Sequence, residues 1–562
     1  MSSTREILTL QFGNYSNYIG AHWWNIQESS FNYDANAGPS EINQDILYRE
    51  GRDFKGQTTY TPRLLLVDLS ASLQHLPEEG TLYEDFQEVA GTLNTEKKID
   101  TVKQTIAWDQ SSIEVIKKDP VSKPKFQKDL DDPDVDIEDN EYNLSENVES
   151  WANYLYTRYH PRTINLIKEY KHSTEKESFD SFSNGMRIWD VEQFNYDFAD
   201  KIRKYLEECD NCQGFHIIFD CHNAFSGFTL TCMEHLNDEY GKDILAFPVF
   251  PPKSVLFENA DAAMTDSIRT ANIALSYSRL SEQSSLFVPL STRDRAWRNL
   301  GTARKFPLLS YEEENLYQTS AVLASFLDTA TLRYRLRDAT CFSFLPGFCA
   351  DLTNYGRKLG AATFSFPFPM RSDQDLIDCL DKFNGEIFTQ LSPNSKIGKN
   401  YVIQSVCVRG IPRTRLKKPM QQAQQQMKMA AYKCNSVSEM FQLYFQCENH
   451  ASLAHVVAAQ EGLTTKIPFP VEIFDTRLNL QGYVQDIERT ENEKVTSVPT
   501  VASVQCSGDL ADTVESLHRE GNRIKIKKLH RFKETGLEAD DYHEALEHLL
   551  QFKDNYEDNF EL

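Results

Sequence analysis

The chain has 562 residues and a formal net charge of −24 at pH 7. This acidic balance excludes general nucleic-acid binding, which needs a basic surface, and disfavours adhesion to anionic lipid, so protein partners fit it better. A chain of this length exceeds one hydrophobic core, and we expect two or three globular domains.

The N-terminal sequence MSSTREILTL lacks the basic region and apolar run of a signal peptide and the Arg-rich pattern of a transit sequence. Apolar runs such as Leu64–Val67 are far shorter than the ~20 residues of a membrane helix. The 11 cysteines are scattered, which suits a reducing compartment. We therefore expect a cytoplasmic protein without a transmembrane segment.

Strand-like and helix-like patterns alternate along the first part of the chain. They fall at Arg5–Gly13 (strand), Asn17–Ser30 (helix), Arg63–Ser70 (strand), Phe198–Asn211 (helix), Gln213–Phe219 (strand) and Ile244–Pro252 (strand). Nearly continuous apolar runs are typical of parallel strands covered on both faces. The order predicts a doubly wound α/β domain whose ligands bind at the carboxyl ends of the strands.

An acidic stretch, DLDDPDVDIEDNE, covers Asp129–Glu141. Because it has little apolar content, we expect a disordered insertion over about residues 110–145. Calcium binding is the alternative raised by its D-x-D spacings. However, the glycine and terminal glutamate of an EF-hand loop are missing.

The segment Asn315–Arg337 has the length and spacing of a long buried helix. The pattern changes after Phe364–Met370, which predicts a first domain at 1–370, a smaller α/β domain at 371–515, and a C-terminal strand and helix at 516–562. The strand is expected at Asn522–Phe532 and the helix at Leu537–Asp558. A basic tract at Arg413–Tyr432 is a candidate partner-docking surface through four cations, Arg413, Arg415, Lys417 and Lys418.

The stretch FDCHNAFSGFTL at Phe219–Leu230 lies between a predicted strand and a predicted helix, the arrangement of a phosphate-binding loop. Such loops normally need several glycines, and this one has Gly227 alone. Cys209, Cys212, Cys221 and His222 also form a C-x2-C-x8-C-H pattern. The intervening strand would separate its halves by about 20 Å, so we expect no metal site. No third group orients His222 with Asp220, Ser226 or Cys221, so no catalytic pair is expected.

Several motifs in order resemble tubulins. They are REILTLQFGNYSNYIGAHWW at the start, YTPRLLLVDL, CDNCQGFHIIFD, NDEYGKDILAFPVFPP and the final TGLEADDYHEALEHLLQFKDNYE. GAHWWN, ILYREGR and the glycine-poor loop resemble one divergent branch, the Misato family. The resemblance covers essentially the whole chain and implies a tubulin/FtsZ-like fold.

The same resemblance allows the nucleotide loops to be compared residue by residue. Gly13 is kept, whereas Asn14 and Tyr15 replace smaller or different side chains. Asp68 is kept, but Ser70 stands where an acid would help to hold magnesium. Glu149 falls where an asparagine would face the γ-phosphate.

The fourth loop keeps Gly227 and carries Ser226 in a shortened form. We expect His222 and Phe225 to fill the space of the phosphate. The position of the catalytic acid aligns with Asn354 or Gly360, and neither is a carboxylate. The six residues Gly13, Asn14, Tyr15, Asp68, Ser226 and Gly227 are thus interpreted as a degenerate nucleotide site. We expect no GTPase activity and no resident cofactor, with weak GTP binding as the open alternative.

The resemblance implies a non-enzymatic role in mitochondrial distribution and morphology and in mitotic spindle assembly with chromosome segregation. It also implies tubulin and the cytosolic chaperonin/prefoldin complex as partners. The expected locations are the cytoplasm and the mitochondrial outer membrane, with peripheral attachment. Two alternatives remain at this point, a residual GTP-binding switch and a polymer-forming cytoskeletal protein.

Overall fold

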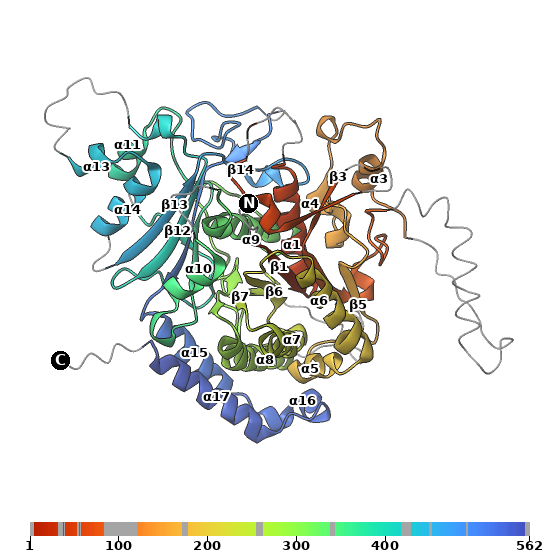
Figure 1. Ribbon diagram of the computed structural model, residues 1–562. Coiled ribbons are helices and arrows are strands. Elements are labelled where there is room, and N and C mark those ends of the chain that lie inside the picture. Colours follow the sequence, from red (N-terminus) through yellow and green to blue (C-terminus); the bar gives the residue numbers. More distant parts are fainter. Residues whose placement is uncertain are drawn as a thin grey trace, which may run out of the picture.

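A computed structural model describes residues 5–31, 38, 40–52, 56, 58–83, 121–170, 178–253, 262–337, 343–383, 385–417, 429–448, 452–490 and 493–556. Within these residues two β-sheets lie side by side with a buried helix between them (Figure 1).

The first sheet has 7 strands and forms the core of the N-terminal half. Its order is β5 (Ile164–Ile167), β4 (Leu64–Leu69), β1 (Ile7–Phe12), β6 (Gly214–Asp220), β7 (Asp243–Phe250) and β8 (Leu286–Phe287), and β9 (Leu290–Ser291) also pairs with β7. All the pairings are parallel, and every residue of β1, β4, β5 and β6 is buried. The nearly continuous apolar runs therefore predicted β1, β4, β6 and β7 correctly, whereas β5 was not predicted.

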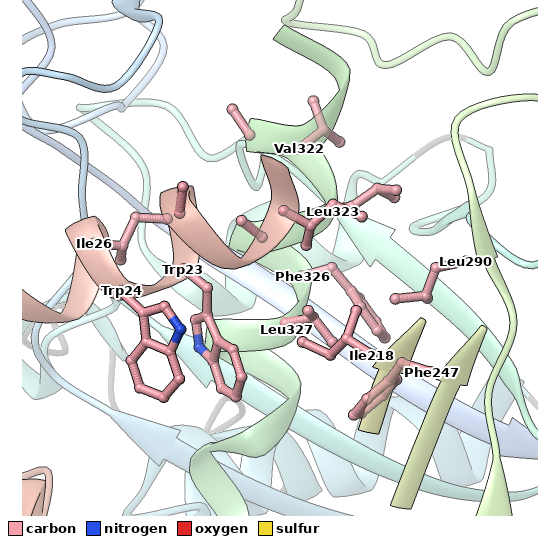
Figure 2. Close-up of a cluster of buried hydrophobic side chains, with 14 of the residues drawn as sticks. Trp23, Trp24, Ile26, Ile218, Phe247, Leu290, Val322, Leu323, Phe326 and Leu327 are labelled. Carbon is pink, nitrogen blue, oxygen red and sulfur yellow. The ribbon is translucent and has the colours of Figure 1, made fainter. Parts of the chain in front are cut away.

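Helices cover both faces of this sheet. One face carries α1 (Asn14–Glu28) and α9 (Leu316–Ala330), and the other carries α5 (Phe182–Trp189), α6 (Ala199–Glu207), α7 (Phe225–Tyr240) and α8 (Ala262–Gln283). Figure 2 shows Trp23 and Trp24 of α1 in one cluster with Phe326 and Leu327 of α9 and with Ile218 and Phe247 of the first sheet. The helix predicted at Asn315–Arg337 is confirmed as α9, followed by the 3-10 turn Thr331–Tyr334.

The second sheet has 5 strands. Its order is β11 (Thr389–Gln390), β10 (Ala361–Ser365), β16 (Thr500–Cys506), β12 (Ile403–Arg409) and β13 (Leu453–Ala459), and β12 and β13 are parallel to each other. Its outer face packs on α11 (Leu376–Asp381) and α14 (Val437–Glu448) in a separate apolar cluster. Because β10 starts at Ala361, the second sheet begins before the expected boundary at residue 370.

Smaller elements connect these layers. They are β2 (Tyr48–Arg52), β3 (Thr58–Pro62), α10 (Leu345–Leu352), α13 (Ala430–Lys433), β14 (Leu463–Thr464), β15 (Ser497–Val498), and the 3-10 turns Gln44–Ile46, Ser70–Ser72, Trp151–Tyr154, Asn354–Gly356, Arg413–Arg415 and Val471–Ile473; a π-helical turn covers Gln193–Phe198.

The expected disordered insertion at 110–145 is wrong for its second part. Residues 121–145 contain α3 (Lys125–Asp131), a 3-10 turn (Ile137–Asp139) and the start of α4 (Leu144–Asn147). Phe126 is 1% exposed, and Gln127 Nε2 donates to Leu155 O at 2.7 Å. One buried aromatic side chain anchors a segment that is otherwise acidic. The remainder, 110–120, lies outside the described residues.

The strand expected at Asn522–Phe532 is also wrong. The chain there runs through α15 (Leu510–Asn522), a 3-10 turn (Ile526–Lys528) and α16 (His530–Glu534) before α17 (Ala539–Asp554), which confirms the predicted last helix. Ile526, Leu529 and Phe532 are all buried, and their spacing of three residues suits helical turns. Figure 1 shows α15 and α17 lying alongside α8.

Candidate functional site

Three strand ends of the first sheet meet where the nucleotide loops were expected. Gly13 follows β1, Asp68 lies in β4, and Asp220 ends β6. Because these strands are neighbours and parallel, their carboxyl ends share one edge of the sheet. This edge is the candidate site.

The N-terminus of α1 points at the Asp220 carboxylate. Tyr15 N donates to Asp220 Oδ2 at 3.2 Å, and Ser16 N donates to Asp220 Oδ1 at 2.9 Å. Free amides at a helix N-terminus are the groups that receive a phosphate in nucleotide sites. In this protein the Asp220 carboxylate accepts the hydrogen bonds of these amides in place of a phosphate.

Gly13 makes this contact possible. It precedes α1 with φ of 107°, a backbone conformation that favours glycine. A Cβ built on Gly13 would lie 2.6 Å from Asp220 Cγ, far inside normal contact distance. The glycine that a nucleotide site would need for its phosphate therefore serves the approach of an internal carboxylate.

Burial decides the charge state of Asp220. The side chain is 2% exposed, and loss of water raises its pKa to about 7, although the amides of Ser16 and Tyr15 lower it. The nearby Asp68 carboxylate adds to the rise. A phosphate bound at the same amides would meet this carboxylate directly, so the residues present do not fit a nucleotide phosphate.

Tyr15 and Asn14 occupy the first turn of α1. The ring of Tyr15 is buried, and its hydroxyl donates to Thr319 Oγ1 of α9 at 3.2 Å. Burial raises the pKa of the Tyr15 phenol, so it stays neutral. Asn14 is half-buried. The bulky tyrosine thus packs the site against the core helix.

Asp68 is fully engaged by protein donors. One of its oxygens accepts from Leu69 N at 2.7 Å and Ser72 Oγ at 2.8 Å. The other accepts from Asn17 Nδ2 and Trp151 Nε1, each at 2.9 Å. Both oxygens are thereby committed to structural hydrogen bonds, which is a poor arrangement for a magnesium ligand. Ser70, beside it, is exposed.

Ser226 and Gly227 lie inside the first turn of α7 instead of in a loop. Ser226 Oγ donates to Asn223 O at 2.6 Å. A Cβ on Gly227 would lie 1.8 Å from Phe182 O of α5, and one on Gly185 would lie 1.7 Å from Ala224 O. The surviving glycine therefore allows two helices to pack closely, and this packing accounts for it without a phosphate.

The expected roles of His222 and Phe225 need correction. Phe225 packs edge-on against Phe179 in the core, with ring centroids 4.9 Å apart. His222 is half-buried, and its backbone oxygen accepts from Asn272 Nδ2 at 2.9 Å. Asp220, in the same stretch of sequence, is the residue that accepts hydrogen bonds from the first amides of α1. Its position at the end of a central strand was the signal available in the sequence.

The other residues considered from the sequence lie apart from this contact. Glu149 is exposed and accepts from Gln74 Nε2 at 3.2 Å. Asn354 is exposed in a 3-10 turn, and Gly360 packs between the two sheets near Val504 and Val288. Cys209 and Cys212 precede β6, whereas Cys221 follows it, so the halves of the C-x2-C-x8-C-H pattern lie at opposite ends of a strand. Among the described residues no group of three His, Cys, Asp or Glu side chains is placed to hold a metal ion.

The basic tract is mostly tied to its own chain. The Arg415 guanidinium lies 3.9 Å from the ring centroid of Tyr483 and donates to Ser372 O at 3.2 Å. Lys417 Nζ donates to Tyr432 O and Cys434 O at 3.0 and 3.1 Å. Arg413 is exposed, and Lys418 lies outside the described residues. Within this tract Arg413 is the described cation that remains suited to docking.

Comparisons with known proteins agree with this architecture. Residues 5–132 match the family model described as Misato Segment II tubulin-like domain, and residues 142–336 match the Tubulin domain. Protein misato of Drosophila melanogaster is 42% identical over 100% of both chains. Protein misato homolog 1 of Homo sapiens is 31% identical over 98% of both chains, and that of Danio rerio is 30% identical over 93% of this chain and 92% of its own.

The parallel sheet, the buried helix α9 and the tubulin match define a protein of the tubulin/FtsZ-like fold class. Within that class, the chain belongs to the Misato family. Among the helices of the described residues, none is long and apolar enough to cross a membrane.

Proposed function

We propose that this protein acts without catalysis, in mitochondrial distribution and morphology and in mitotic spindle assembly with chromosome segregation. Membership of the Misato family supports the role, as the resemblance implies. The observation that supports the non-enzymatic part is the Asp220 carboxylate at the amides of Tyr15 and Ser16. If this carboxylate keeps a nucleotide phosphate from the amides, no γ-phosphoryl group is held there for hydrolysis.

The proposed route is contact with tubulin and with the cytosolic chaperonin and prefoldin, in the cytoplasm and at the outer face of mitochondria. A net charge of −24 suits protein partners better than nucleic acid. The full chain carrying an affinity tag should recover tubulin, chaperonin and prefoldin subunits above the level of an unrelated acidic protein. Recovery at the control level would remove this route.

Nucleotide independence has a direct test. Titration of the full chain with a fluorescent GTP analogue, with and without magnesium, should show no saturable signal. Tubulin would serve as the positive control. Saturable, magnesium-dependent binding would instead favour the residual switch.

The cellular role is tested by depletion and rescue. Depletion should disturb both mitochondrial distribution and spindle assembly, and re-expression of the full chain should restore both. If neither mitochondria nor spindles change on depletion, the proposed function is wrong. Sedimentation of the purified chain, alone and with tubulin, tests the polymer-forming alternative, because a monomeric profile in both cases counts against it.

A further inference from the structure

Two cysteines flank the turn that joins α6 to β6. Cys209 follows the end of α6, and Cys212 precedes the start of β6. Both are partly exposed, and Asp210 and Asn211 between them are exposed. Of the other described cysteines, Cys447 is exposed and the rest are buried. Within the described residues, this C-x-x-C turn is therefore where two accessible thiols lie close together in the chain.

The turn is fixed by a buried carboxylate. Asp210 N donates to Glu6 Oε1 at 3.2 Å, and Asn211 N donates to Glu6 Oε2 at 3.0 Å. Glu6 is 3% exposed, and its backbone oxygen accepts from Gln213 N at 2.8 Å. One residue thus holds the turn at three points, so the two cysteines cannot move apart without breaking buried hydrogen bonds.

The two thiols interact with each other. Cys209 Sγ lies 3.1 Å from Tyr205 O, and Cys212 Sγ lies 3.6 Å from Gly214 O. The Cys209 proton also has the Cys212 sulfur as an acceptor, and this hydrogen bond lowers the pKa of Cys212 and raises the pKa of Cys209. Cys212 therefore forms a thiolate more readily than an isolated cysteine does, although burial opposes it.

Cations lie near both sulfur atoms. Arg63 Nη1 donates to Cys209 Sγ at 3.9 Å, and the positive charge of Lys242 lowers the pKa of Cys212 further. The Glu6 carboxylate has the opposite effect on both pKa values, but Arg63 partly offsets its charge, with Nη2 at 4.0 Å from Glu6 Oε1. A thiolate on either cysteine thus has a cation to stabilise it, which is the environment of reactive cysteines.

We propose that Cys209 and Cys212 form a thiol–disulfide exchange site that is oxidised by small disulfides, such as oxidised glutathione, and reduced by small thiols. The Cys212 thiolate attacks one sulfur of the oxidant, forms a mixed disulfide and releases one glutathione thiolate. Cys209 then gives up its proton, and its sulfur attacks Cys212 Sγ and displaces the second glutathione. In the sum, two protein thiols lose two electrons and two protons, and one oxidised glutathione becomes two reduced ones. In the reducing compartment expected from the sequence, such a disulfide is transient.

The test treats the full, reduced chain with oxidised glutathione, stops the reaction with acid and reads the products by peptide mass spectrometry. The segment with Cys209 and Cys212 should lose two hydrogens, carry no glutathione and recover both thiols with dithiothreitol. Cys447, an exposed cysteine without a second one nearby in the sequence, should keep one glutathione. A glutathione retained on each of Cys209 and Cys212, or an unreacted pair beside a modified Cys447, would overturn the proposal.

The dependence on glutathione concentration distinguishes an internal disulfide from two separate adducts. Closing the internal disulfide releases two glutathione molecules, whereas forming an adduct on Cys447 releases one. Dilution of total glutathione by about tenfold, at a constant ratio of oxidised to reduced form, should therefore raise the disulfide-to-dithiol ratio of Cys209 and Cys212 about tenfold. The ratio of adduct to thiol at Cys447 should not change. The same dependence at both places would reject an internal disulfide.

Single substitutions test the order of the two steps. Cys209→Ser should retain one glutathione on Cys212, because no second thiol displaces it. Cys212→Ser should retain one on Cys209 but form it about threefold or more slowly, since Cys209 lacks the lowered pKa. Cys221 and Cys232, both buried, should stay unmodified in every sample, which confirms that the chain is folded. Faster reaction of Cys209 than of Cys212 would overturn Cys212 as the attacking sulfur.

Discussion

The Asp220 carboxylate accepts a hydrogen bond from the backbone N–H of Ser16 at 2.9 Å, so the N-terminus of α1 is capped by a residue more than two hundred positions away. Asp220→Ala should leave the amides of Tyr15 and Ser16 buried without an acceptor. Each of the two amides costs about 1–3 kcal/mol, so the free energy of unfolding should fall by about 2–6 kcal/mol.

Formate gives this prediction a specific signature. It carries the missing carboxylate and is small enough for the space that the side chain leaves. Added formate should raise the thermal midpoint of Asp220→Ala more than an equal concentration of chloride does, and should not affect wild type in this way. Ile217→Ala, a cavity variant on the same buried strand, is the control. A formate effect of equal size in Ile217→Ala would contradict the role of Asp220.

The free energy of unfolding should depend on pH through the titration of Asp220. The pKa of Asp220 is raised to about 7 by burial, well above its unfolded value. The folded chain therefore holds this proton more tightly, and its contribution to stability is lost as pH rises towards 7. The stability of wild type relative to Asp220→Asn should fall by on the order of 2 kcal/mol between about pH 5 and about pH 7. Urea unfolding at several pH values measures it, and a flat difference would show an ordinary pKa.

Gly227 should prove to be a packing residue. Gly227→Ala places a Cβ 1.8 Å from Phe182 O, so α5 and α7 must separate. We expect a loss of about 1–3 kcal/mol in unfolding free energy, measured with urea. Gly347→Ala in α10 is the matched control, because its nearest atom would be 4.0 Å away. That change should be neutral or slightly stabilising. Similar losses in both variants would show that replacing a glycine near the start of a helix is itself destabilising, and that the α5–α7 contact is not the cause.

Much of the fold was predictable because burial leaves a direct trace in the sequence. Leu64–Leu69 is buried throughout, and its nearly continuous apolar run, interrupted by Asp68, predicted β4. The short turns were harder. The positions of Ile526 and Phe532 fit both an alternating strand and a helical spacing. In the described residues no strand pairs with this segment, and it forms helical turns. Pairing depends on the tertiary structure, so the local sequence could not decide between the two. Phe126 likewise orders an acidic segment through one contact that composition averages hide.

Some residues of this sheet edge were named from the sequence, but its central interaction was not. Gly13, Tyr15 and Asp68 do meet at one sheet edge, as parallel strand ends must. The contact between Asp220 and Ser16 joins residues far apart in the chain, and no local pattern encodes it. Gly227 gave a false indication, because a glycine needed for close helix packing and one needed for a phosphate look identical in sequence.

A buried ionic group joins the core helix to the second sheet, and it yields the last prediction. Asp328 of α9 pairs with Arg335 at 2.9 Å and with Arg409 of β12, and none of the three is more than 2% exposed. The two arginines hold the pKa of Asp328 below its usual value despite burial. Arg409→Met should leave part of the buried charge uncompensated and cost about 3–5 kcal/mol of unfolding free energy.

Lys396→Met, which removes an exposed ion pair with Asp512, provides the comparison. An exposed pair contributes about 0–1 kcal/mol, so this variant should unfold close to wild type. If Arg409→Met were equally mild, Arg335 alone would suffice to hold Asp328. The replacement Arg335→Met would then show the large loss, since Arg335 Nη1 also donates to Thr331 Oγ1 at 2.8 Å and to Asp328 O at 3.3 Å. Mild effects of both changes would show that α9 and β12 are held together by apolar packing alone.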